Sequence, residues 1–595
     1  MDVTRAGVVG LGTMGSNIAI VCARAGVETV ALEASEAALE AGMRRVREFL
    51  DAGVAKGKTS PADREATLGR IRGAASLSAL SGCGLVIEAI AEDLAQKNAL
   101  FHRLGGILGE EAILASNTST LSIASMGAAS GRPDRTIGTH FCLPAALNRL
   151  VEVAPGPLTS EETAASVTAF LERVGQTPVR VKDRPGFILN YLLVAFQNDC
   201  IRLVESGYTT PAELDAAIQL GLGYKMGPMR LLDVEGLDIH RTVSLSMYEQ
   251  LKDPRYLPPP LVDRMIDSGR LGAKAGRGFY AYKKAGLFGV AEPEAGPGEA
   301  GDPSAGRALA DGIRKVGVVG VGAMGSGIAQ VCAAAGLEVA AVELSPEALE
   351  AGLARVHRNL DGAVKRGKMD EVAKEAALRR IQGATELSAL ADCDLIIEVV
   401  VEDLAVKLDL FQKLGRVARE GAIIASNTSC LSVTAMAARA RRPERALGLH
   451  FFNPPYAMRL VEVISAVQTA PEIAQFGQAF CRRIGKTPIP VKDRPGFLVN
   501  RLLVPFLNQA AQAYDEGLAP REALDKAVHL GLGHPMGPLT LLDLVGIDVH
   551  THVADAMAAE LGEARFMAPP LLRRMTSAGW LGRKTGRGFY EYGGR

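Results

Sequence analysis

The chain has 595 residues, and its 66 basic and 66 acidic side chains balance to a formal net charge of zero. A balanced charge argues against a nucleic-acid-binding protein, which normally carries a basic excess. The sequence shows no apolar run long enough for a membrane span and no secretory leader, and its eight cysteines lack the spacing of a disulfide framework or metal site. These features predict a cytoplasmic protein of about four domains, with no metal and no membrane contact.

The first predicted element is an apolar strand over residues 6–10, which runs into a glycine-rich turn and a helix. Gly10, Gly12 and Gly15 have the G-x-G-x-x-G spacing that holds the pyrophosphate of a dinucleotide at a helix N-terminus. Glu33 closes the next strand, where a carboxylate accepts hydrogen bonds from the adenosine ribose and repels a 2′-phosphate. The pattern predicts an NAD site rather than an NADP site.

Short strands then alternate with amphipathic helices until about residue 184, and the pattern becomes helical beyond it. The alternation predicts βαβ units and a doubly wound parallel sheet of Rossmann type. The stretch 187–207 carries apolar side chains at helical spacing on one broad face. We therefore predict an α/β NAD-binding domain over 1–184 and an all-α domain over 185–283. The clearest strands are expected over 6–10, 28–33, 85–90 and 112–116.

The whole pattern then repeats at a fixed offset, since Val8 corresponds to Val318 and Gly276 to Gly586, 310 residues later in both cases. We call residues 1–283 copy 1 and residues 313–595 copy 2. A repeat of this length is a duplicated two-domain module rather than a solenoid unit. Copy 2 is predicted to have an NAD-binding domain over 313–494 and a helical domain over 495–595, after a Gly- and Pro-rich linker over 284–312. Its cofactor-binding residues are expected to be Gly320, Gly322, Gly325 and Glu343.

Four polar residues of copy 1 form a candidate catalytic set: Ser119, His140, Glu152 and Asn190. The first three have a structural alternative. The SNTS segment could cap the next helix, the histidine could be a satisfied core residue, and the glutamate could face solvent. Asn190 lies beside an apolar stripe, where an amide without a partner costs about 1–3 kcal/mol, so we expect it to face a ligand or a partner. The corresponding residues of copy 2 are Ser429, His450, Glu462 and Asn500.

Copy 2 also contains the motifs GVGAMGSGIA, SNTSCLS, GLHFFNPP, RLVEV, VKDRPGFLVNR, GHPMGPLTLLD and GRKTGRGFYEY. In these motifs and their order the chain resembles the (S)-3-hydroxyacyl-CoA dehydrogenase family, including the 3-hydroxybutyryl-CoA dehydrogenases. The resemblance implies reversible oxidation of a 3-hydroxyacyl-CoA, such as 3-hydroxybutyryl-CoA, to the 3-oxoacyl-CoA, with hydride transfer to NAD. It implies a histidine base oriented by the glutamate, a serine and an asparagine that bind the reacting oxygen, and a glutamate near the nicotinamide, here Glu92 and Glu402.

The two copies differ beside the histidine, where copy 1 has Leu143 in place of Asn453, a position that the family pattern puts near the acyl-CoA. Copy 1 keeps all four candidate catalytic residues, so the difference bears on its substrate binding. Copy 2 is the more securely predicted active site, and copy 1 remains a candidate for activity on a different acyl group. Two basic loops are candidates for binding the CoA phosphates, although such runs are often only solvated surface. Their lysines are Lys56, Lys58, Lys365 and Lys368.

In the single-module enzymes that the chain resembles, the helical domain forms a homodimer. A tether holds the second copy at an effective concentration of roughly millimolar, which predicts an intrachain pseudo-dimer and leaves further homo-oligomerisation open. Two alternatives for the function also stay open. One is a dehydrogenase of free 3-hydroxyacids, which shares the glycine-rich opening. The other is an NAD-binding protein in which one or both sites are catalytically silent.

Overall fold

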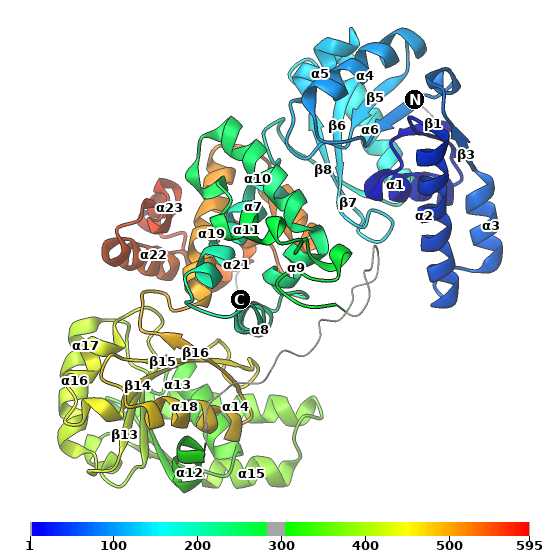
Figure 1. The fold of residues 1–595 in the computed structure, drawn as a ribbon. Coiled ribbons are helices and arrows are strands. Elements are labelled where there is room, and N and C mark those ends of the chain that lie inside the picture. Colours follow the sequence, from blue (N-terminus) through cyan, green and yellow to red (C-terminus); the bar gives the residue numbers. More distant parts are fainter. Residues whose placement is uncertain (1–2, 283–303, 594–595) are drawn as a thin grey trace.

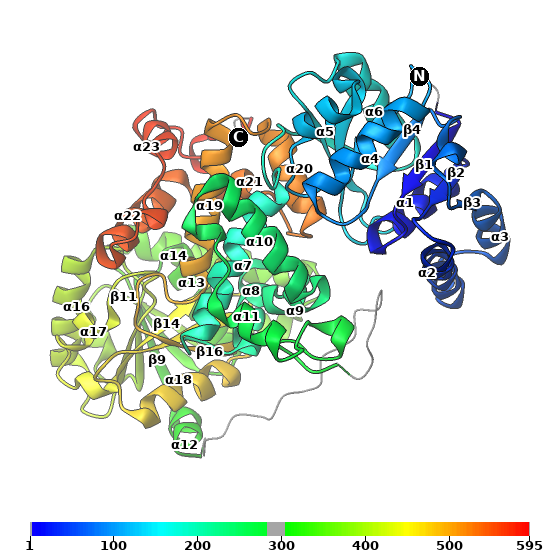
Figure 2. The ribbon, with the colours of Figure 1, turned by 45° about the horizontal axis from the view of Figure 1, so that its top comes forward.

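The computed structural model describes residues 3–282 and 304–593. Within these residues the two copies have the same order of elements, as the repeat predicts. The helical domains of both copies lie side by side in the middle, and the two α/β domains lie at opposite ends (Figure 1, Figure 2). The predicted fold class, a Rossmann-type domain followed by a helical domain and the pair duplicated, is confirmed.

Each α/β domain is built on an eight-stranded sheet. The strands of copy 1 are β1 (Arg5–Val9), β2 (Glu28–Leu32), β3 (Ile71–Ala74), β4 (Leu85–Glu88), β5 (Ile113–Ser116), β6 (Thr136–Phe141), β7 (Leu150–Pro155) and β8 (Thr177–Arg180). Those of copy 2 are β9 (Lys315–Val319), β10 (Glu338–Val342), β11 (Ile381–Ala384), β12 (Leu395–Glu398), β13 (Ile423–Ser426), β14 (Ala446–Phe451), β15 (Leu460–Ser465) and β16 (Thr487–Lys492).

The strand order is β3-β2-β1-β4-β5-β6-β7-β8, with the equivalent order in copy 2. Neighbouring strands are parallel except for β6 with β7 and β14 with β15, which are antiparallel. This reversal was not predicted, because the alternating pattern of strands and helices indicated only parallel pairing. The central strands are mostly apolar and almost fully buried, as expected for a sheet covered by helices on both faces.

The helices around the sheets begin at recognisable caps. Ser35, Ser60, Asp93 and Ser160 each accept a hydrogen bond from a backbone N–H in the first turn of the helix that follows. The helices are α1 (Thr13–Arg24), α2 (Glu36–Ala55), α3 (Pro61–Gly69), α4 (Leu94–Ile107), α5 (Ile123–Ser130) and α6 (Glu161–Arg173) in copy 1. In copy 2 they are α13 (Ala323–Ala334), α14 (Pro346–Lys365), α15 (Glu371–Arg379), α16 (Leu404–Val417), α17 (Val433–Ala437) and α18 (Pro471–Arg483).

Each helical domain is organised around one long buried helix, α7 (Leu189–Glu205) in copy 1 and α19 (Val499–Asp515) in copy 2. The chain enters both helices through a left-handed residue, Phe187 with φ of 46° and Phe497 with φ of 48°. Backbone held in this region is strained and is often found beside functional sites. The other helices are α8 (Pro211–Leu222), α9 (Pro228–Glu235), α10 (Leu237–Leu251), α11 (Pro260–Asp267), α20 (Arg521–Gly531), α21 (Pro538–Val545), α22 (Ile547–Leu561) and α23 (Pro570–Ser577).

The two helical domains contact each other through α7 and α19. The buried Gln509 donates from Nε2 to the carbonyl oxygen of Tyr191 at 2.5 Å, and the Tyr208 hydroxyl donates to the carbonyl oxygen of Phe497 at 2.9 Å. Each helical domain also reaches the α/β domain of the other copy, because α20 packs on β7 and β8 while α8 packs on β15 and β16. The approach is close enough that a Cβ at Gly531 would come within 2.7 Å of Leu189.

The predicted linker over 284–312 lies outside the described residues up to residue 303. Its last nine residues are not a linker but form α12 (Ser304–Gly312), which packs on α18. Arg483 of α18 donates to the carbonyl oxygens of Ala310 and Ile313, and both of these side chains are buried. The helix forms because it covers an apolar part of the copy 2 domain, a tertiary contact that the composition of the segment did not reveal. Within the described residues, no helix is both long and apolar enough to cross a membrane.

Candidate active site

The glycine-rich turn between β1 and α1 has the conformation that a dinucleotide site requires. Gly10 has a φ of 89°, which favours glycine, and a Cβ at Gly15 would collide with the carbonyl oxygen of Gly10. A Cβ at Gly12 would meet nothing within 4 Å, so the backbone there is open to a ligand. No side chain caps α1, which leaves its first N–H groups available to a pyrophosphate. Gly320, Gly322 and Gly325 repeat this arrangement in copy 2.

The acidic residue that follows the second strand faces this turn in both copies. Glu33 accepts hydrogen bonds from the backbone N–H of Leu11 at 2.6 Å and of Ala34 at 3.2 Å. In copy 2, Glu343 accepts one from the N–H of Val321 at 2.8 Å. These contacts hold a carboxylate beside the glycine-rich turn, where it can bind a ribose and repel a 2′-phosphate. The residues present therefore fit NAD.

The antiparallel pairing of β6 with β7 places His140 directly opposite Glu152. The His140 Nδ1 and a Glu152 carboxylate oxygen lie 2.7 Å apart, and the same atoms of His450 and Glu462 lie 2.7 Å apart in copy 2. Glu152 is fully buried, so the alternative that it faces solvent is wrong. A carboxylate at this position can hold the imidazole in one orientation and stabilise its protonated form.

The second carboxylate oxygen of Glu152 has partners that no local sequence pattern indicates. It accepts hydrogen bonds from the backbone N–H groups of Ile188 at 2.8 Å and Leu189 at 3.0 Å, at the start of α7. Glu462 does the same for Leu498 and Val499 at the start of α19. One carboxylate therefore joins the histidine to the helix that carries the asparagine, and the N-terminal end of that helix also favours its negative charge.

The side chains of the SNTST segment after β5, and of Ser122 just beyond it, make different contacts. Asn117 accepts a hydrogen bond from the backbone N–H of Phe141 at 2.9 Å, which ties the segment to the end of β6. The Ser119 hydroxyl lies 3.3 Å from Nε2 of His140. Ser122, rather than Ser119, caps the next helix by accepting from the N–H of Ser125. The capping alternative therefore explains Ser122 and leaves Ser119 free for another role.

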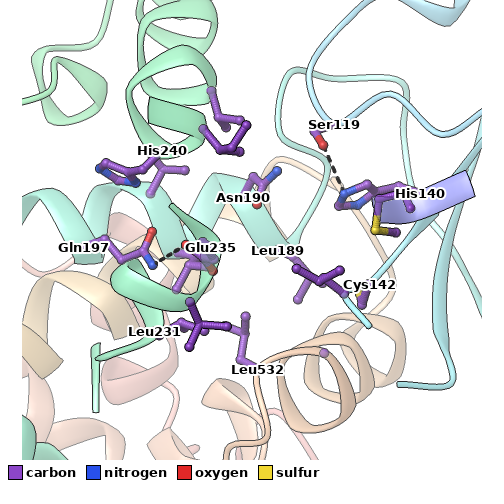
Figure 3. A pocket seen from close by; sticks show the side chains of 18 of the residues that line it. Ser119, His140, Cys142, Leu189, Asn190, Gln197, Leu231, Glu235, His240 and Leu532 are labelled. Carbon is purple, nitrogen blue, oxygen red and sulfur yellow. Dashed lines mark hydrogen bonds between the residues drawn. The ribbon is translucent and has the colours of Figure 1, made fainter. Parts of the chain in front are cut away.

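A cavity of about 400 Å³ lies between the α/β and helical domains of copy 1, and Ser119, His140 and Asn190 all line it. Figure 3 shows Ser119 and His140 on one side of this cavity, with Asn190 projecting from α7 toward its middle. Gly531 and Leu532 from the end of α20 also line the cavity. The site of copy 1 is thus completed by residues of copy 2. In copy 2, Asn500 donates from Nδ2 to the carbonyl oxygen of Ser429 at 3.4 Å, so it too lies beside the serine.

A buried charged cluster supports the serine segment. Glu92 accepts hydrogen bonds from the Thr118 hydroxyl at 2.6 Å and from the backbone N–H of Ser119 at 2.8 Å. Lys97 lies behind it, 2.5 Å from Glu88 and 3.4 Å from Glu92. Glu88 and Lys97 were missed in the sequence analysis. Their signal was a glutamate at the end of an apolar strand and a lysine in the first turns of the next helix, a pattern that also occurs on solvated surfaces.

Copy 2 has the same cluster, in which Lys407 lies between Glu398 and Glu402. Burial raises the pKa of Glu402, but the charge of Lys407 and the hydrogen bonds from Thr428 and Ser429 outweigh it, so the pKa lies below its ordinary value. Glu402 is therefore ionised at neutral pH and holds the backbone of Ser429 in place.

The remaining predicted site residues lie at the surface. Lys56 and Lys58 are exposed in the turn between α2 and α3, and Lys365 and Lys368 are exposed at the equivalent place in copy 2. These four lysines do not line the cavity of copy 1. Leu143 lines that cavity and is 40% exposed. Asn453, at the same place in copy 2, is also exposed.

Comparison with known proteins identifies both domain types. The model of the 3-hydroxyacyl-CoA dehydrogenase NAD binding domain matches residues 5–184 and 315–494, and the model of the C-terminal domain matches 186–282 and 496–592. A probable 3-hydroxybutyryl-CoA dehydrogenase of Deinococcus radiodurans is 44% identical over 278 residues, covering 47% of this chain and 100% of the relative. A 3-hydroxybutyryl-CoA dehydrogenase of Mycobacterium tuberculosis is 46% identical over 286 residues, covering 48% of this chain and 100% of the relative.

Among solved structures, a 3-hydroxybutyryl-CoA dehydrogenase from Escherichia coli K12 superimposes with a TM-score of 0.69 at 24% identity. The match covers 98% of this chain and 100% of that chain, and it supports the fold. The family models cover both copies almost completely, whereas the curated relatives correspond to one copy each. The chain therefore belongs to the 3-hydroxyacyl-CoA dehydrogenase family, and it is an NAD-dependent oxidoreductase in which both family domains occur twice.

Proposed function

We propose that both copies oxidise (S)-3-hydroxyacyl-CoA reversibly to 3-oxoacyl-CoA, with 3-hydroxybutyryl-CoA as a substrate. The observation that carries this proposal is the buried histidine–glutamate pair, which occurs in both copies with Nδ1 of the histidine 2.7 Å from the carboxylate. NAD held at the glycine-rich turns would supply the acceptor for the hydride that leaves the hydroxyl-bearing carbon. The match to the family over both domains favours a thioester substrate over a free 3-hydroxyacid.

The protein side chains move and hold the proton. In copy 1, Nε2 of His140 takes the proton of the substrate hydroxyl, as a general base that contributes about 10²–10⁴ in rate. Glu152 stabilises the imidazolium that forms, and its bonds to the start of α7 keep it in place. Ser119 and Asn190 donate hydrogen bonds to the reacting oxygen, since both line the cavity beside the histidine. Equivalent roles fall to Ser429, His450, Glu462 and Asn500 in copy 2.

The cofactor residues follow from the same geometry. The glycine-rich turns would hold the pyrophosphate, with Glu33 and Glu343 on the adenosine ribose. Glu92 and Glu402 would lie near the nicotinamide, because each holds the serine segment of its site. We place the reaction in the cytoplasm, since all eight cysteines are free and buried, as in a reducing compartment.

The exposed lysines on the α2–α3 turn and its equivalent are proposed to bind CoA phosphates. Lys365 and Lys368 lie in one basic turn with Arg366, and Lys56 and Lys58 lie in the other. Exposed cations bind phosphate more weakly as salt rises. Replacing both lysines of one turn by alanine should therefore raise the KM for acetoacetyl-CoA at that copy and reduce its salt dependence. An unchanged KM and salt dependence would reject the role.

We further propose that the two copies of one chain replace the homodimer of single-module enzymes. The buried bonds from Gln509 to Tyr191 and from Tyr208 to Phe497 support this, as does the contribution of Gly531 to the cavity of copy 1. Activity per chain should then stay constant on dilution to nanomolar concentration, where the solution mass should approach that of one chain, 62.6 kDa. Activity that falls on dilution together with dissociation would show that pairing occurs between chains. Self-association that leaves the activity unchanged would fit this proposal.

The function itself is tested by NADH oxidation with acetoacetyl-CoA, using wild type, His140→Gln, His450→Gln and the double variant. If both copies work, each single variant retains part of the rate and the double variant loses it. If only His450→Gln abolishes turnover, copy 1 does not use this substrate, and Leu143 in place of Asn453 becomes the first candidate for the difference. A double variant as active as wild type would refute the assignment of the histidines.

A further inference from the structure

The cavity of copy 1 ends in a polar pair that the proposed reaction does not use. Gln197 on α7 donates from Nε2 to the carboxylate of Glu235 on α9 at 2.9 Å, and both side chains line the cavity. Figure 3 shows this pair on the far side of the cavity from His140, with Asn190 between them. The side chain of Gln197 is almost completely buried. Polar groups in such a place cost free energy unless they find hydrogen-bonding partners.

Copy 2 shows that the fold does not need this pair. At the offset of 310 residues, Gln197 corresponds to Leu507 and Glu235 to Val545. These two are the cavity-lining positions that are polar in copy 1 and apolar in copy 2, whereas Leu143 with Asn453 and Ala273 with Arg583 differ in the opposite sense. Other cavity-lining residues of copy 1 are unchanged in copy 2, among them Asn190, Leu193, Val194, Leu231, His240 and Val243.

The position of the pair corresponds to the far end of an acyl chain. Asn190 and Gln197 lie about two turns apart on α7, which is about 10 Å along the helix axis. Helical side chains lean toward the N-terminus, so the amide of Gln197 lies roughly 5–10 Å from the level of Asn190. An extended chain advances about 1.2 Å per bond. A group bound by the pair would therefore be roughly four to eight bonds from the reacting carbon.

The chemistry of the pair favours a hydrogen-bond donor. Burial raises the pKa of Glu235 to about 7, although the bond from Gln197 lowers it, so both forms of the carboxyl are present at neutral pH. Both forms can accept a hydrogen bond, and the carbonyl oxygen of Gln197 is a second acceptor. A carboxylate on the substrate would instead meet a like charge, and a plain alkyl end would offer no donor to the Gln197 carbonyl oxygen or to the second carboxyl oxygen of Glu235.

We propose that copy 1 binds acyl-CoA substrates whose chain carries a hydroxyl group at its far end, and that Gln197 and Glu235 bind this hydroxyl. The apolar side chains at the same positions make copy 2 the site for plain alkyl chains. The proposal rests on the proposed function, because it assumes that the acyl group extends from His140 along α7. One chain would then have two dehydrogenase sites that catalyse the same reaction and differ in the end of the acyl chain that they bind.

The test compares 3-oxooctanoyl-CoA, its terminally hydroxylated derivative and its terminally carboxylated derivative. His450→Gln leaves copy 1 as the working site, and His140→Gln leaves copy 2. We expect copy 1 to have a kcat/KM about tenfold higher for the hydroxylated chain than for the plain chain, a ratio equivalent to about 1.4 kcal/mol. Copy 2 should prefer the plain chain. The carboxylated chain should be the poorest substrate of copy 1, and a preference for it would overturn the assignment of a hydroxyl.

Matched variants are obtained by exchanging the residues of one copy for those at the same positions in the other. Gln197→Leu with Glu235→Val gives copy 1 the residues of copy 2 and should remove its preference for the hydroxylated chain. Leu507→Gln with Val545→Glu is the reverse change in copy 2 and should create that preference. Because gain and loss are tested at separate sites, a folding failure of one variant leaves the other decisive. An unchanged preference in a folded variant overturns the proposal.

If the proposed dehydrogenase function is wrong, the same assays give a result that differs from failure of the hydroxyl-binding proposal. Copy 1 would then turn over neither acetoacetyl-CoA nor the longer chains in the His450→Gln variant. In that case the affinities of the plain and hydroxylated thioesters are measured calorimetrically with His140→Gln/His450→Gln, before and after the change at Gln197 and Glu235. Tighter binding of the hydroxylated chain that disappears with the change supports the proposal. Equal affinities overturn it.

Discussion

The buried lysine in the charged cluster of copy 2 supports a prediction that does not depend on the substrate. The side chain of Lys407 is 1% exposed and that of Glu398 is 0% exposed, and their charged atoms lie 2.6 Å apart. Glu402 lies 3.3 Å from the same ammonium group. Glu398 also accepts hydrogen bonds from the Ser426 hydroxyl at 2.7 Å and the backbone N–H of Val400 at 2.7 Å. Replacement of Lys407 by Met preserves most of the volume and leaves two carboxylates without their cation.

The expected loss of stability is large because the carboxylate of Glu398 is fully buried and cannot be solvated by water. Removal of one partner of a buried ion pair typically costs about 3–5 kcal/mol. In a domain of this size 1 kcal/mol lowers the Tm by about 2–4 °C, so Lys407→Met should lower the Tm of the copy 2 α/β domain by roughly 6–20 °C. The pKa of Glu402 should rise, since the charge of Lys407 is a main cause of its low value. Because Ser429 would then be held less firmly, the turnover rate of copy 2 should also fall.

Scanning calorimetry of the full chain measures the effect, and Lys97→Met is the matched change in copy 1. The double variant Glu398→Gln/Lys407→Met removes both charges and should regain at least half of the lost stability, because an uncharged buried pair needs no counter-ion. The activity of copy 2 is followed in the His140→Gln background. A decrease in Tm of less than about 2 °C for Lys407→Met, or a double variant no more stable than the single one, would refute the reasoning.

Three further predictions concern single carboxylates. Glu462→Gln should lower kcat about 10²–10⁴-fold in the His140→Gln background, because a neutral amide cannot stabilise the imidazolium; an unchanged NADH oxidation rate would contradict this role. Glu343→Gln removes the charge that repels a 2′-phosphate, so the preference of copy 2 for NADH over NADPH should narrow by at least about tenfold in the same assay; an unchanged ratio would place the discrimination elsewhere. Glu235 holds its proton in the folded chain up to about pH 7, whereas the unfolded chain releases it near pH 4.5. The stability that this proton contributes is therefore lost between about pH 4.5 and pH 7, so across that interval the free energy of unfolding of the wild type should fall relative to that of Glu235→Gln; the same pH dependence of the two proteins in urea unfolding would show that Glu235 does not contribute.

Local sequence patterns were sufficient for much of this protein. The predicted strands over 6–10, 28–33, 85–90 and 112–116 correspond to β1, β2, β4 and β5 within two residues at each end. The glycine-rich turn could be recognised because Gly10 and Gly15 are required by a left-handed backbone and a close helix–strand contact. The duplication and the family resemblance followed from motif order alone. These features depend on neighbouring residues, whose backbone preferences and spacing can be read without a fold.

Contacts between distant segments were decided by the tertiary structure. The antiparallel register of β6 with β7 brings His140 opposite Glu152, and the start of α7 then supplies the second set of bonds to that carboxylate. The charged cluster around Lys97, the helix at Ser304–Gly312 and the meeting of Gln197 with Glu235 were also absent from the sequence analysis. In each case the stabilisation comes from removing side chains from water against partners far along the chain. Such partners are set by how sheets and helices pack, and a local pattern does not contain that information.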